Sequence, residues 1–375
     1  MKIGLVCPYS INKHGGVLEH VLAVRDGLVS RGHDVRIITP RPRGYGSEPE
    51  PEGVIFFGNS TDLRTVDTTS QVSSTGDTEK IDAILGHEKF DILHFHEPWQ
   101  PLLSRQLLQR SQSVNIGTFH AKIPDAVVRR ALLRTVSPYL KSVLKYLHAL
   151  TAVSPSGAEY VSGMTDQSIT IIPNGIDLKK YQQAAKHVNH ESKTVLFIGR
   201  LERRKGVSYL LQAFQLITQD NPNIKLIIAG DGPDREKLEL LAEDLNIKNI
   251  SFLGFVSEEL KLQLLQEADI FCSPALYGES FGIVLLEAMA TDTVTVAGNN
   301  SGYADLMEGL GALSVVNPTD VPEFARRLEL LLHEPELRKL WQNWATAYVK
   351  QFNYSNIVDK YEELYREALE QYAQR

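Results

Sequence analysis

Hydrophobic and polar positions follow two alternating patterns along most of the chain. Short, nearly continuous apolar runs predict strands that are covered on both faces, and the stretches between them repeat apolar residues at the spacing of amphipathic helices. The first unit consists of an apolar run at 2–7, a Gly-Gly turn at 15–16, a helical stretch at 17–30 and a second apolar run at 33–40. This order predicts the first half of a doubly wound parallel α/β sheet.

The pattern occurs twice, which predicts two domains of the same α/β class. The polar stretch at 177–193 is typical of an interdomain linker, and a second series of strands begins with the apolar run at 194–199. We therefore predict two Rossmann-like doubly wound parallel-sheet domains, one at residues 1–178 and one at residues 190–355.

One part of the first domain does not follow the pattern. Residues 41–78 are rich in Pro, Gly, Ser and Thr and contain a single short apolar piece at 54–57. We expect long loops around one short strand there, because these residue types favour turns.

Composition and charge limit the classes of protein to consider. The chain has 375 residues, enough for two domains with sizeable cores, and its 43% hydrophobic and 23% charged residues are typical of a globular protein. The net charge of −7 argues against a general nucleic-acid-binding protein. Cys7 and Cys272 both lie in apolar runs, so we expect no disulfide framework and a reducing cytoplasm. The sequence shows no signal peptide and no long apolar stretch, which predicts a chain that is neither secreted nor membrane-spanning.

Two glutamates flank a predicted transition from loop to helix. Glu279 precedes the helical run at 283–290, and Glu287 lies about two turns along it. The first amides of a helix are unpaired and partly positive, so they form an anion site. Carboxylates on either side of an anion site suit a ligand with hydroxyls at both ends and phosphate between them, such as a nucleotide sugar. The spacing alone is equally compatible with an ordinary helix and two solvated acids.

Two cations occupy a similar place in the second domain. Arg200 follows the predicted strand at 194–199, and Lys205 precedes the next predicted helix. An arginine binds phosphate as a fork and a lysine binds it as a point charge, so a diphosphate could be held here. The alternative is ordinary surface charge. The order of residues does not match a P-loop.

Histidines mark the ends of two predicted strands in the first domain. His94, His96 and Glu97 lie at the end of one strand, and alternate strand residues share a face, which raises a metal site as one interpretation. No further ligands follow at a recognisable spacing, so we predict no metal and favour polar residues at the ligand-binding edge of the sheet. His120 ends the next strand; read alone, it is compatible with a solvated histidine.

A basic segment follows in this otherwise acidic protein. Its cations are Lys122, Arg129, Arg130, Arg134, Lys141 and Lys145. The apolar spacing predicts helices, and two interpretations remain open. In the first, these are ordinary domain helices with solvated faces. In the second, residues 122–148 form a surface that lies on anionic lipid.

Several motifs occur together in one order along the chain. They are the Gly-Gly turn, Thr118–Phe119–His120, Ile172–Pro173–Asn174–Gly175–Ile176–Asp177, the string G-R-L-x-x-x-K-G at 199–206, and Glu279 and Glu287 as an E-x7-E pair. This set resembles the retaining glycosyltransferases of family four. Residues 3–10, the turn at 15–17 with His20–Val21, and His96–Glu97–Pro98 are most similar to bacterial phosphatidylinositol alpha-mannosyltransferases. The resemblance implies the GT-B fold, in which two Rossmann-like domains face each other across a cleft and the last helix, here 356–375, packs back on the first domain.

The resemblance also implies roles for single residues. Gly16 would approach the donor diphosphate, and His120 would hold the transferred sugar. Glu279 would contact the sugar ring, and Glu287 would bind the ribose hydroxyls.

The remaining roles concern charge. Arg200, Lys205 and the amides of Phe281, Gly282 and Ile283 would stabilise the charge that develops on the leaving diphosphate. In the family no covalent nucleophile is used, and the leaving phosphate takes the proton of the acceptor. We therefore expect no metal and no cofactor other than the donor substrate.

The function implied is transfer of a hexose, with retention of anomeric configuration, from GDP-mannose or a UDP-sugar to a lipid or lipid-linked acceptor. Phosphatidylinositol is one candidate acceptor, and the basic segment fits a lipid surface. The enzyme is expected in the cytoplasm or bound peripherally to the inner face of the cell membrane, with no nucleic-acid partner.

Three residues depart from the family pattern on the acceptor side. Relatives carry a glutamine where Leu18 stands, a small amide near Trp99 and a hydroxyl at Ala121. Loss of these hydrogen-bonding groups argues against an inositol headgroup, so a soluble or polysaccharide acceptor is the main alternative. A nucleotide-sugar epimerase of the same fold would convert the donor without an acceptor. A non-catalytic sugar-binding protein would never release free nucleotide diphosphate.

Overall fold

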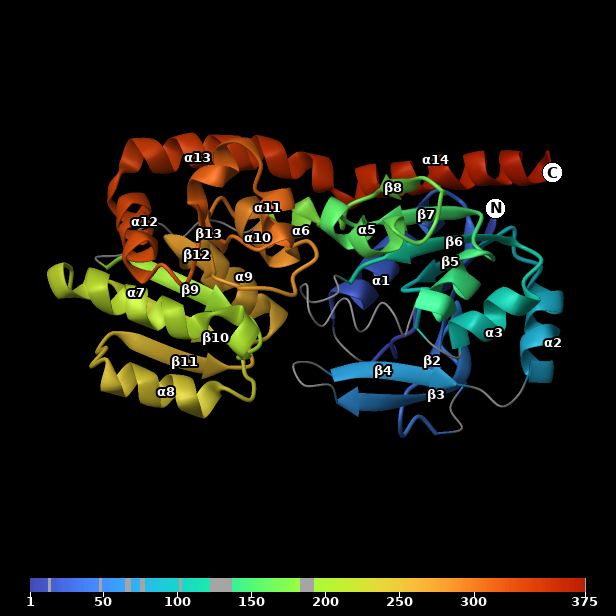
Figure 1. The fold of residues 1–375 in the computed structure, drawn as a ribbon, viewed down its shortest axis with the longest axis horizontal. Coiled ribbons are helices and arrows are strands. Elements are labelled where there is room, and N and C mark those ends of the chain that lie inside the picture. The colour runs from blue at the N-terminus through green and yellow to red at the C-terminus, as the bar shows by residue number, and fades with distance from the viewer. Residues whose placement is uncertain are drawn as a thin grey trace. The chain divides into compact units, whose positions relative to one another are not determined.

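The computed structural model describes residues 1–12, 15–46, 49–64, 69–74, 78–100, 103–121, 137–182 and 192–374. Contacts between residues divide the chain into two compact units, Met1–Gly175 with Tyr354–Arg375, and Ile176–Asn353 (Figure 1). Both units are α/β, with a mostly parallel sheet and helices around it, which confirms the predicted fold class. The C-terminal helix therefore belongs to the same unit as the N-terminal strand.

The sheet of the first unit has the strand order β4-β3-β2-β1-β5-β6-β7-β8. Its strands are β1 (Lys2–Val6), β2 (Asp34–Arg41), β3 (Val54–Arg64), β4 (Thr69–Ser74), β5 (Ile92–His96), β6 (Val114–Phe119), β7 (Ala149–Ala152) and β8 (Ile169–Ile171). Seven strands pair in parallel, and β4 pairs antiparallel with β3. The strand order reverses between β1 and β5, and ligands of open α/β sheets bind at the carboxyl ends of such neighbouring strands. His96 is the last residue of β5.

The expectation of long loops at 41–78 is wrong in part. Strand β3 runs to Arg64 and returns as β4, with Asn59 paired to Ser74 and Arg64 to Thr69. A hairpin at the edge of a sheet needs no continuous apolar run, because only one of its two strands pairs with the rest of the sheet. The Ser- and Thr-rich sequence therefore concealed it.

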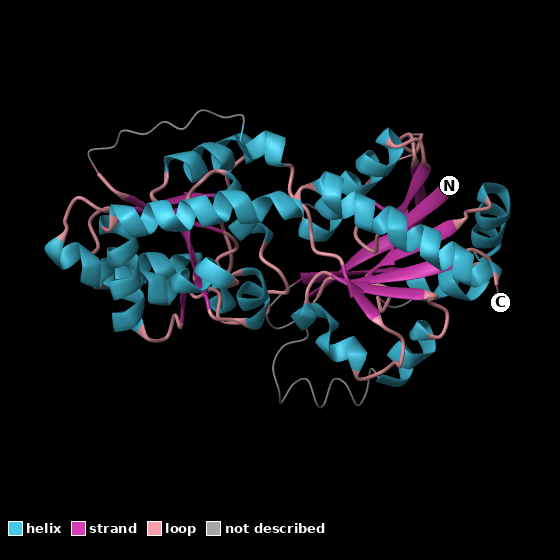
Figure 2. Cartoon of the chain, turned by 90° about the horizontal axis from the view of Figure 1, so that it is seen from above, coloured by secondary structure: helices cyan, strands magenta, loops and turns pink. Residues whose placement is uncertain are grey.

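Helices of the first unit flank this sheet. They are α1 (Gly16–Ser30), α2 (Thr78–Glu88), α3 (Leu103–Arg110), α5 (Pro155–Ser162) and α14 (Tyr354–Ala373). Helices α1 and α14 share one hydrophobic cluster with β1 and β2, and Figure 2 shows α14 lying over the strands of this sheet. Their contact is close: a Cβ added to Gly27 would lie 2.6 Å from the side chain of Val358. The absence of a side chain at Gly27 thus lets the C-terminal helix lie against the first helix.

The sheet of the second unit is parallel throughout and has the order β11-β10-β9-β12-β13-β14. Its strands are β9 (Thr194–Ile198), β10 (Lys225–Ala229), β11 (Ile250–Gly254), β12 (Ile270–Ser273), β13 (Val294–Gly298) and β14 (Val315–Val316). Its α-helices are α6 (Leu178–Gln182), α7 (Val207–Asp220), α8 (Arg235–Asp244), α9 (Glu258–Glu267), α10 (Ile283–Ala290), α11 (Ser301–Leu306), α12 (Val321–His333) and α13 (Pro335–Tyr348). Among the described residues, no helix combines the length and apolar character needed to cross a bilayer.

The predicted linker at 177–193 needs a correction at its start. Residues Leu178–Gln182 form α6, and its Leu178 and Tyr181 side chains are buried. Residues 183–191 lie outside the described part of the chain. The polar composition did not indicate this helix. Only Leu178 and Tyr181, one turn apart, are buried, and two apolar positions are too few to form a helical pattern.

Candidate functional site

A cluster of one acid and two cations lies in the second unit. The Glu279 Oε1 atom accepts from Arg204 Nη1 at 2.5 Å and lies 2.8 Å from Lys205 Nζ. Burial alone raises the pKa of the Glu279 carboxyl, but the charges of Lys205 and Arg204 outweigh it, and the net pKa is lowered. Glu279 is therefore a carboxylate at neutral pH, and both cations are held beside it.

Arg200, the other predicted phosphate-binding cation, has a different partner. Its Nη2 atom lies 3.0 Å from Glu202 Oε1, and its side chain is 53% exposed. The Glu202 Oε2 atom accepts from Arg204 Nε at 2.9 Å. The structure thus links Arg200 to Arg204 through Glu202. Sequence reasoning missed Arg204, which lies at a variable position of the G-R-L-x-x-x-K-G string.

Close backbone packing positions this loop. The 3-10 turn Arg203–Lys205 ends at Gly206, whose φ of 70° is in the left-handed region. A Cβ on Gly206 would lie 2.1 Å from the carbonyl oxygen of Pro274, so only glycine fits. The amide of Leu276 donates to the carbonyl of Arg204 at 2.8 Å, which joins the loop after β9 to the loop after β12.

The N-terminus of α10 is the predicted anion site. Gly282 is its N-cap with a φ of 108°, and among the described residues no side chain caps the helix. A Cβ on Gly282 would lie 2.9 Å from the ring of Tyr303, so the backbone packs closely there. Phe281, Gly282 and Ile283 therefore form a helix start without the side-chain acceptor that usually binds such amides.

Glu287 lies on α10 and is 5% exposed. Its Oε1 atom accepts from the Tyr181 hydroxyl at 2.7 Å and from Lys261 Nζ at 2.9 Å. Burial lowers the pKa of Lys261, but Glu287 and Glu258 more than compensate, and the net pKa is raised. Sequence reasoning missed both partners: Tyr181 lay in the predicted linker, and Lys261 is a helix lysine without a motif.

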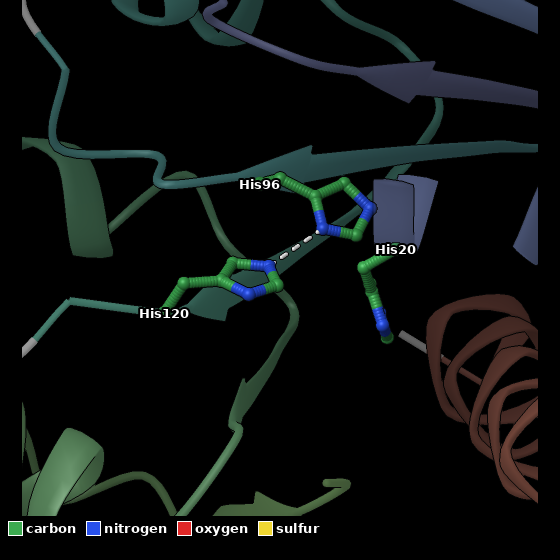
Figure 3. A group of neighbouring side chains, drawn as sticks. All are labelled: His20, His96 and His120. Atoms are coloured by element: carbon green, nitrogen blue, oxygen red, sulfur yellow. Dashed lines mark hydrogen bonds between the residues drawn. The ribbon is translucent and has the colours of Figure 1, made fainter. Parts of the chain in front are cut away.

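In the first unit, His120 follows β6 and is 5% exposed. Its Nε2 atom lies 2.9 Å from His96 Nδ1, and Figure 3 shows the two rings joined by this hydrogen bond with His20 beside them. Burial, as the largest cause, lowers the pKa of His96 and of His120 well below the ordinary value. The same cause lowers the pKa of His20 to about 3. The three imidazoles are therefore neutral at physiological pH.

Glu97 holds the backbone at His120. Its Oε1 atom accepts from the amides of His120 at 2.6 Å and Ala121 at 2.5 Å, and its other oxygen accepts from the indole of Trp99. Glu97 is buried and has a φ of 53°, an uncommon conformation for a residue other than glycine. Burial raises the pKa of its carboxyl to about 7, against the opposing effect of these donors. Two of the three positions that depart from the family pattern, Trp99 and Ala121, thus meet at Glu97.

The remaining predicted residues have simpler surroundings. Gly16 begins α1 after the N-cap Gly15, and Leu18 is buried in the core that α1 forms with the sheet. In the basic segment, residues 122–136 lie outside the described part of the chain. Beyond them, residues 137–144 are helical, and Lys141 and Lys145 are exposed. Only the end of the proposed lipid-binding surface thus lies among the described residues.

Two Rossmann-like units, the second with an acid–cation cluster and a helix start that no described side chain caps, are the architecture of a GT-B glycosyltransferase. Residues 14–180 match the family model described as Glycosyltransferase Family 4, and residues 179–347 match Glycosyl transferases group 1. The chain is 30% identical over 364 residues to a phosphatidyl-myo-inositol mannosyltransferase of Mycolicibacterium smegmatis, covering 95% of this chain and 91% of that protein. The chain therefore belongs to the glycosyltransferase family that includes this mannosyltransferase.

Solved structures show the same fold at lower identity. Sucrose-phosphate synthase from Thermosynechococcus elongatus gives a TM-score of 0.77 at 20% identity and covers 100% of both chains. An Anabaena protein crystallised with UDP and glucose gives a TM-score of 0.75 at 17% identity, covering 98% of this chain and 100% of that one. The predicted fold and family are thus confirmed.

Proposed function

We propose that the protein transfers a hexose from a nucleotide diphosphate sugar to a lipid or lipid-linked acceptor, with retention of anomeric configuration. The observation that carries the proposal is the cluster in which Arg204 and Lys205 bind Glu279, in the same unit as the uncapped N-terminus of α10. Cations and helix amides that are already in place stabilise negative charge without reorganisation. A leaving diphosphate is the group that such a site favours.

The donor would contact this unit through several groups. Glu287 would bind the ribose hydroxyls through Oε2, because Tyr181 and Lys261 both bind Oε1. Arg200, Lys205 and the amides of Phe281–Gly282–Ile283 would bind the diphosphate, and Glu279 would contact the sugar ring. The family resemblance assigns Gly16 to the diphosphate and His120 to the transferred sugar. GDP-mannose and UDP-sugars are the candidate donors; a mannosyltransferase relative favours the first and an Anabaena structure with UDP favours the second.

The reaction would proceed without a covalent enzyme intermediate. The bond between the anomeric carbon and the diphosphate oxygen breaks, and the acceptor oxygen bonds to that carbon on the same face. The proton of the acceptor hydroxyl passes to the departing phosphate oxygen. The role of the protein is then to orient both substrates and to stabilise the charge on the leaving group.

A lipid acceptor at the cytoplasmic membrane face is proposed from the name of the mannosyltransferase relative and from the exposed Lys141 and Lys145. One observation favours a soluble acceptor instead: the apolar Leu18 side chain is buried in the core at a position where the family resemblance implies a glutamine, so it offers no hydrogen bond to an inositol hydroxyl. Both acceptors use the same donor chemistry.

The test is a transfer assay with radiolabelled UDP-, GDP- and ADP-sugars, each with and without vesicles that contain phosphatidylinositol. We expect one donor to raise the melting temperature and to release nucleotide diphosphate when vesicles are present, with label in the lipid. Conversion of the donor without an acceptor would show an epimerase. Binding without release of nucleotide under any acceptor condition would overturn the proposal.

A further inference from the structure

Three histidines from separate elements meet inside the first unit. His20 lies on α1, His96 ends β5 and His120 follows β6 (Figure 3). One ring nitrogen of each lies within 4.8 Å of the others, and all three side chains are buried. Within the described residues this is the group with the donor atoms and spacing of a metal site.

Two nitrogens in this group have no hydrogen-bond partner among the described residues. They are His20 Nδ1 and His96 Nε2, and both are inaccessible to solvent. A buried polar atom without a partner is costly, and native structures usually supply a water, an ion or a ligand. The unsatisfied nitrogens therefore point to an occupant.

The surroundings of the rings resemble those of metal-bound histidines. The other nitrogen of His20, Nε2, lies 3.2 Å from the Tyr361 hydroxyl of α14. A metal-binding imidazole usually bonds through its second nitrogen to such a partner, which fixes the tautomer. Beside His120, the buried Asn174 side chain forms a hydrogen bond that acts to raise the pKa of the ring, against the larger effect of burial. A hydrogen bond of this kind on the second ring nitrogen also orients an imidazole that binds metal.

The neighbouring His94 differs from these three. Its Nδ1 atom lies 2.7 Å from the Tyr365 hydroxyl and its Nε2 atom 2.6 Å from Thr118 Oγ1. Both of its nitrogens are therefore occupied, and His94 is a structural residue. The sequence-based metal interpretation grouped His94, His96 and Glu97, whereas the structure groups His96 with His20 and His120.

We propose that His20, His96 and His120 bind one first-row transition-metal ion, with Zn²⁺ as the probe. Imidazole nitrogens suit Zn²⁺, and three protein ligands with a fourth position open is a common arrangement. Nitrogens bound to Zn²⁺ lie about 2.1 Å from it in a tetrahedral arrangement, so the ring nitrogens, now within 4.8 Å of one another, would lie roughly 3.4 Å apart around the ion. The ion would bind His20 Nδ1 and His96 Nε2, the two nitrogens without a described partner, and His120 Nε2, which gives up its hydrogen bond to His96.

This site has a consequence that rests on the proposed function. An ion that binds His120 withdraws its ring from the sugar, so Zn²⁺ inhibits transfer. The ion is thus not a cofactor of the reaction. Binding itself is measured without a transfer assay, so failure of the proposed activity and failure of the metal site are distinguishable.

The experiment uses the full, untagged chain after treatment with a chelator. Titration with Co²⁺ is expected to give the visible absorption of a nitrogen-rich site at one ion per chain, and Zn²⁺ is expected to displace it. His20→Gln and His96→Gln should weaken binding at least tenfold, since each removes a ligand. His87→Gln, at a side chain that is 84% exposed, is the matched control and should bind as the parent does.

Tyr361→Phe keeps the ring shape and tests the site if the histidine variants do not fold. Loss of the hydroxyl beside His20 should weaken Zn²⁺ binding about tenfold while circular dichroism is unchanged. Absence of a Co²⁺ spectrum in the parent, or equal binding by the parent and the folded His20→Gln and Tyr361→Phe variants, would overturn the proposal. Zn²⁺ inhibition that chelator reverses would support its consequence.

Discussion

The hydroxyl of Tyr181 donates to Glu287 Oε1 at 2.7 Å, across 106 positions of sequence. This bond fixes the carboxylate that we expect to bind the donor ribose. Because the bond reaches one oxygen only, it orients Glu287 without using the other oxygen. The contact joins the short helix α6 to α10, within the unit that we expect to bind the donor.

Tyr181→Phe tests this relationship. A hydrogen bond to a charged group is worth roughly 1.5 kcal/mol, so its loss should raise the donor KM about tenfold with little change in kcat. Steady-state kinetics with varied donor will measure this. Tyr372→Phe, at a ring that is 43% exposed, should leave both constants unchanged. Equal constants for Tyr181→Phe and the parent would show that Glu287 needs no such support.

Long-range contacts of this kind mark the limit of what the sequence could predict. The order of strands and helices follows from apolar runs and helical spacing, which are local properties. Arg204 binds Glu279 across 75 positions, and Tyr181 is concealed in a polar stretch. No spacing rule brings such residues together. His20 carried part of the family resemblance, but it gave no metal signal because a histidine among apolar helix positions usually packs in a core.

The family motifs identified candidate site residues that hydrophobic spacing could not. Lys205 and Glu279 were selected from family strings, and the structure places them 2.8 Å apart. The motif could not show that Arg200 pairs with Glu202 instead, because that choice depends on the turn before Gly206. Backbone geometry of this kind becomes visible only in the folded unit.

Arg200→Ala tests the binding of the diphosphate. The side chain is 53% exposed and pairs at the surface, so its removal should leave the fold intact. Loss of one charge from the leaving-group site should lower kcat/KM about 100-fold. Arg203→Ala removes a neighbouring exposed arginine and is the matched control. Activity of Arg200→Ala equal to that of this control would remove the diphosphate role of Arg200.

The raised pKa of Glu97 predicts that the stability of the fold depends on pH. Its folded pKa of about 7 is above its ordinary value of 4.5, so the folded state favours the protonated form. The stabilising contribution is complete below pH 4.5 and is lost as the pH rises through 7. The free energy of unfolding of the parent, relative to Glu97→Gln, should therefore fall by up to about 3 kcal/mol across that window.

Chemical denaturation of both proteins between pH 4.5 and 8 will measure this difference. Glutamine has the same shape and keeps a carbonyl oxygen for the amides of His120 and Ala121, but it does not titrate. A difference that is constant or grows with pH would show that the three donors, and not burial, determine the ionisation of Glu97.

Gly206→Ala tests the turn that carries Arg204 and Lys205. A Cβ there would meet the Pro274 carbonyl oxygen at 2.1 Å and would also strain a φ of 70°. We expect a loss of at least about 2 kcal/mol in the free energy of unfolding. Gly163→Ala is the control, since its Cβ meets nothing within 4 Å. A small and equal effect of both changes would mean that the turn readily adjusts.

The end of the basic segment tests the choice of acceptor. Lys141 on the described helix and Lys145 on the turn that follows it are exposed, whereas Leu140 and Leu144 beside them are buried. If this surface lies on anionic lipid, each lysine contributes about 1 kcal/mol to binding. The double change Lys141→Gln and Lys145→Gln should then weaken sedimentation with phosphatidylinositol vesicles about 30-fold at low salt, and the effect should shrink as salt screens the charges. Lys237→Gln and Lys350→Gln together remove the same charge from the second unit. Equal loss of vesicle binding in the two double variants would assign the effect to net charge, and a soluble acceptor would then be the better interpretation, because no basic surface would direct the enzyme to lipid.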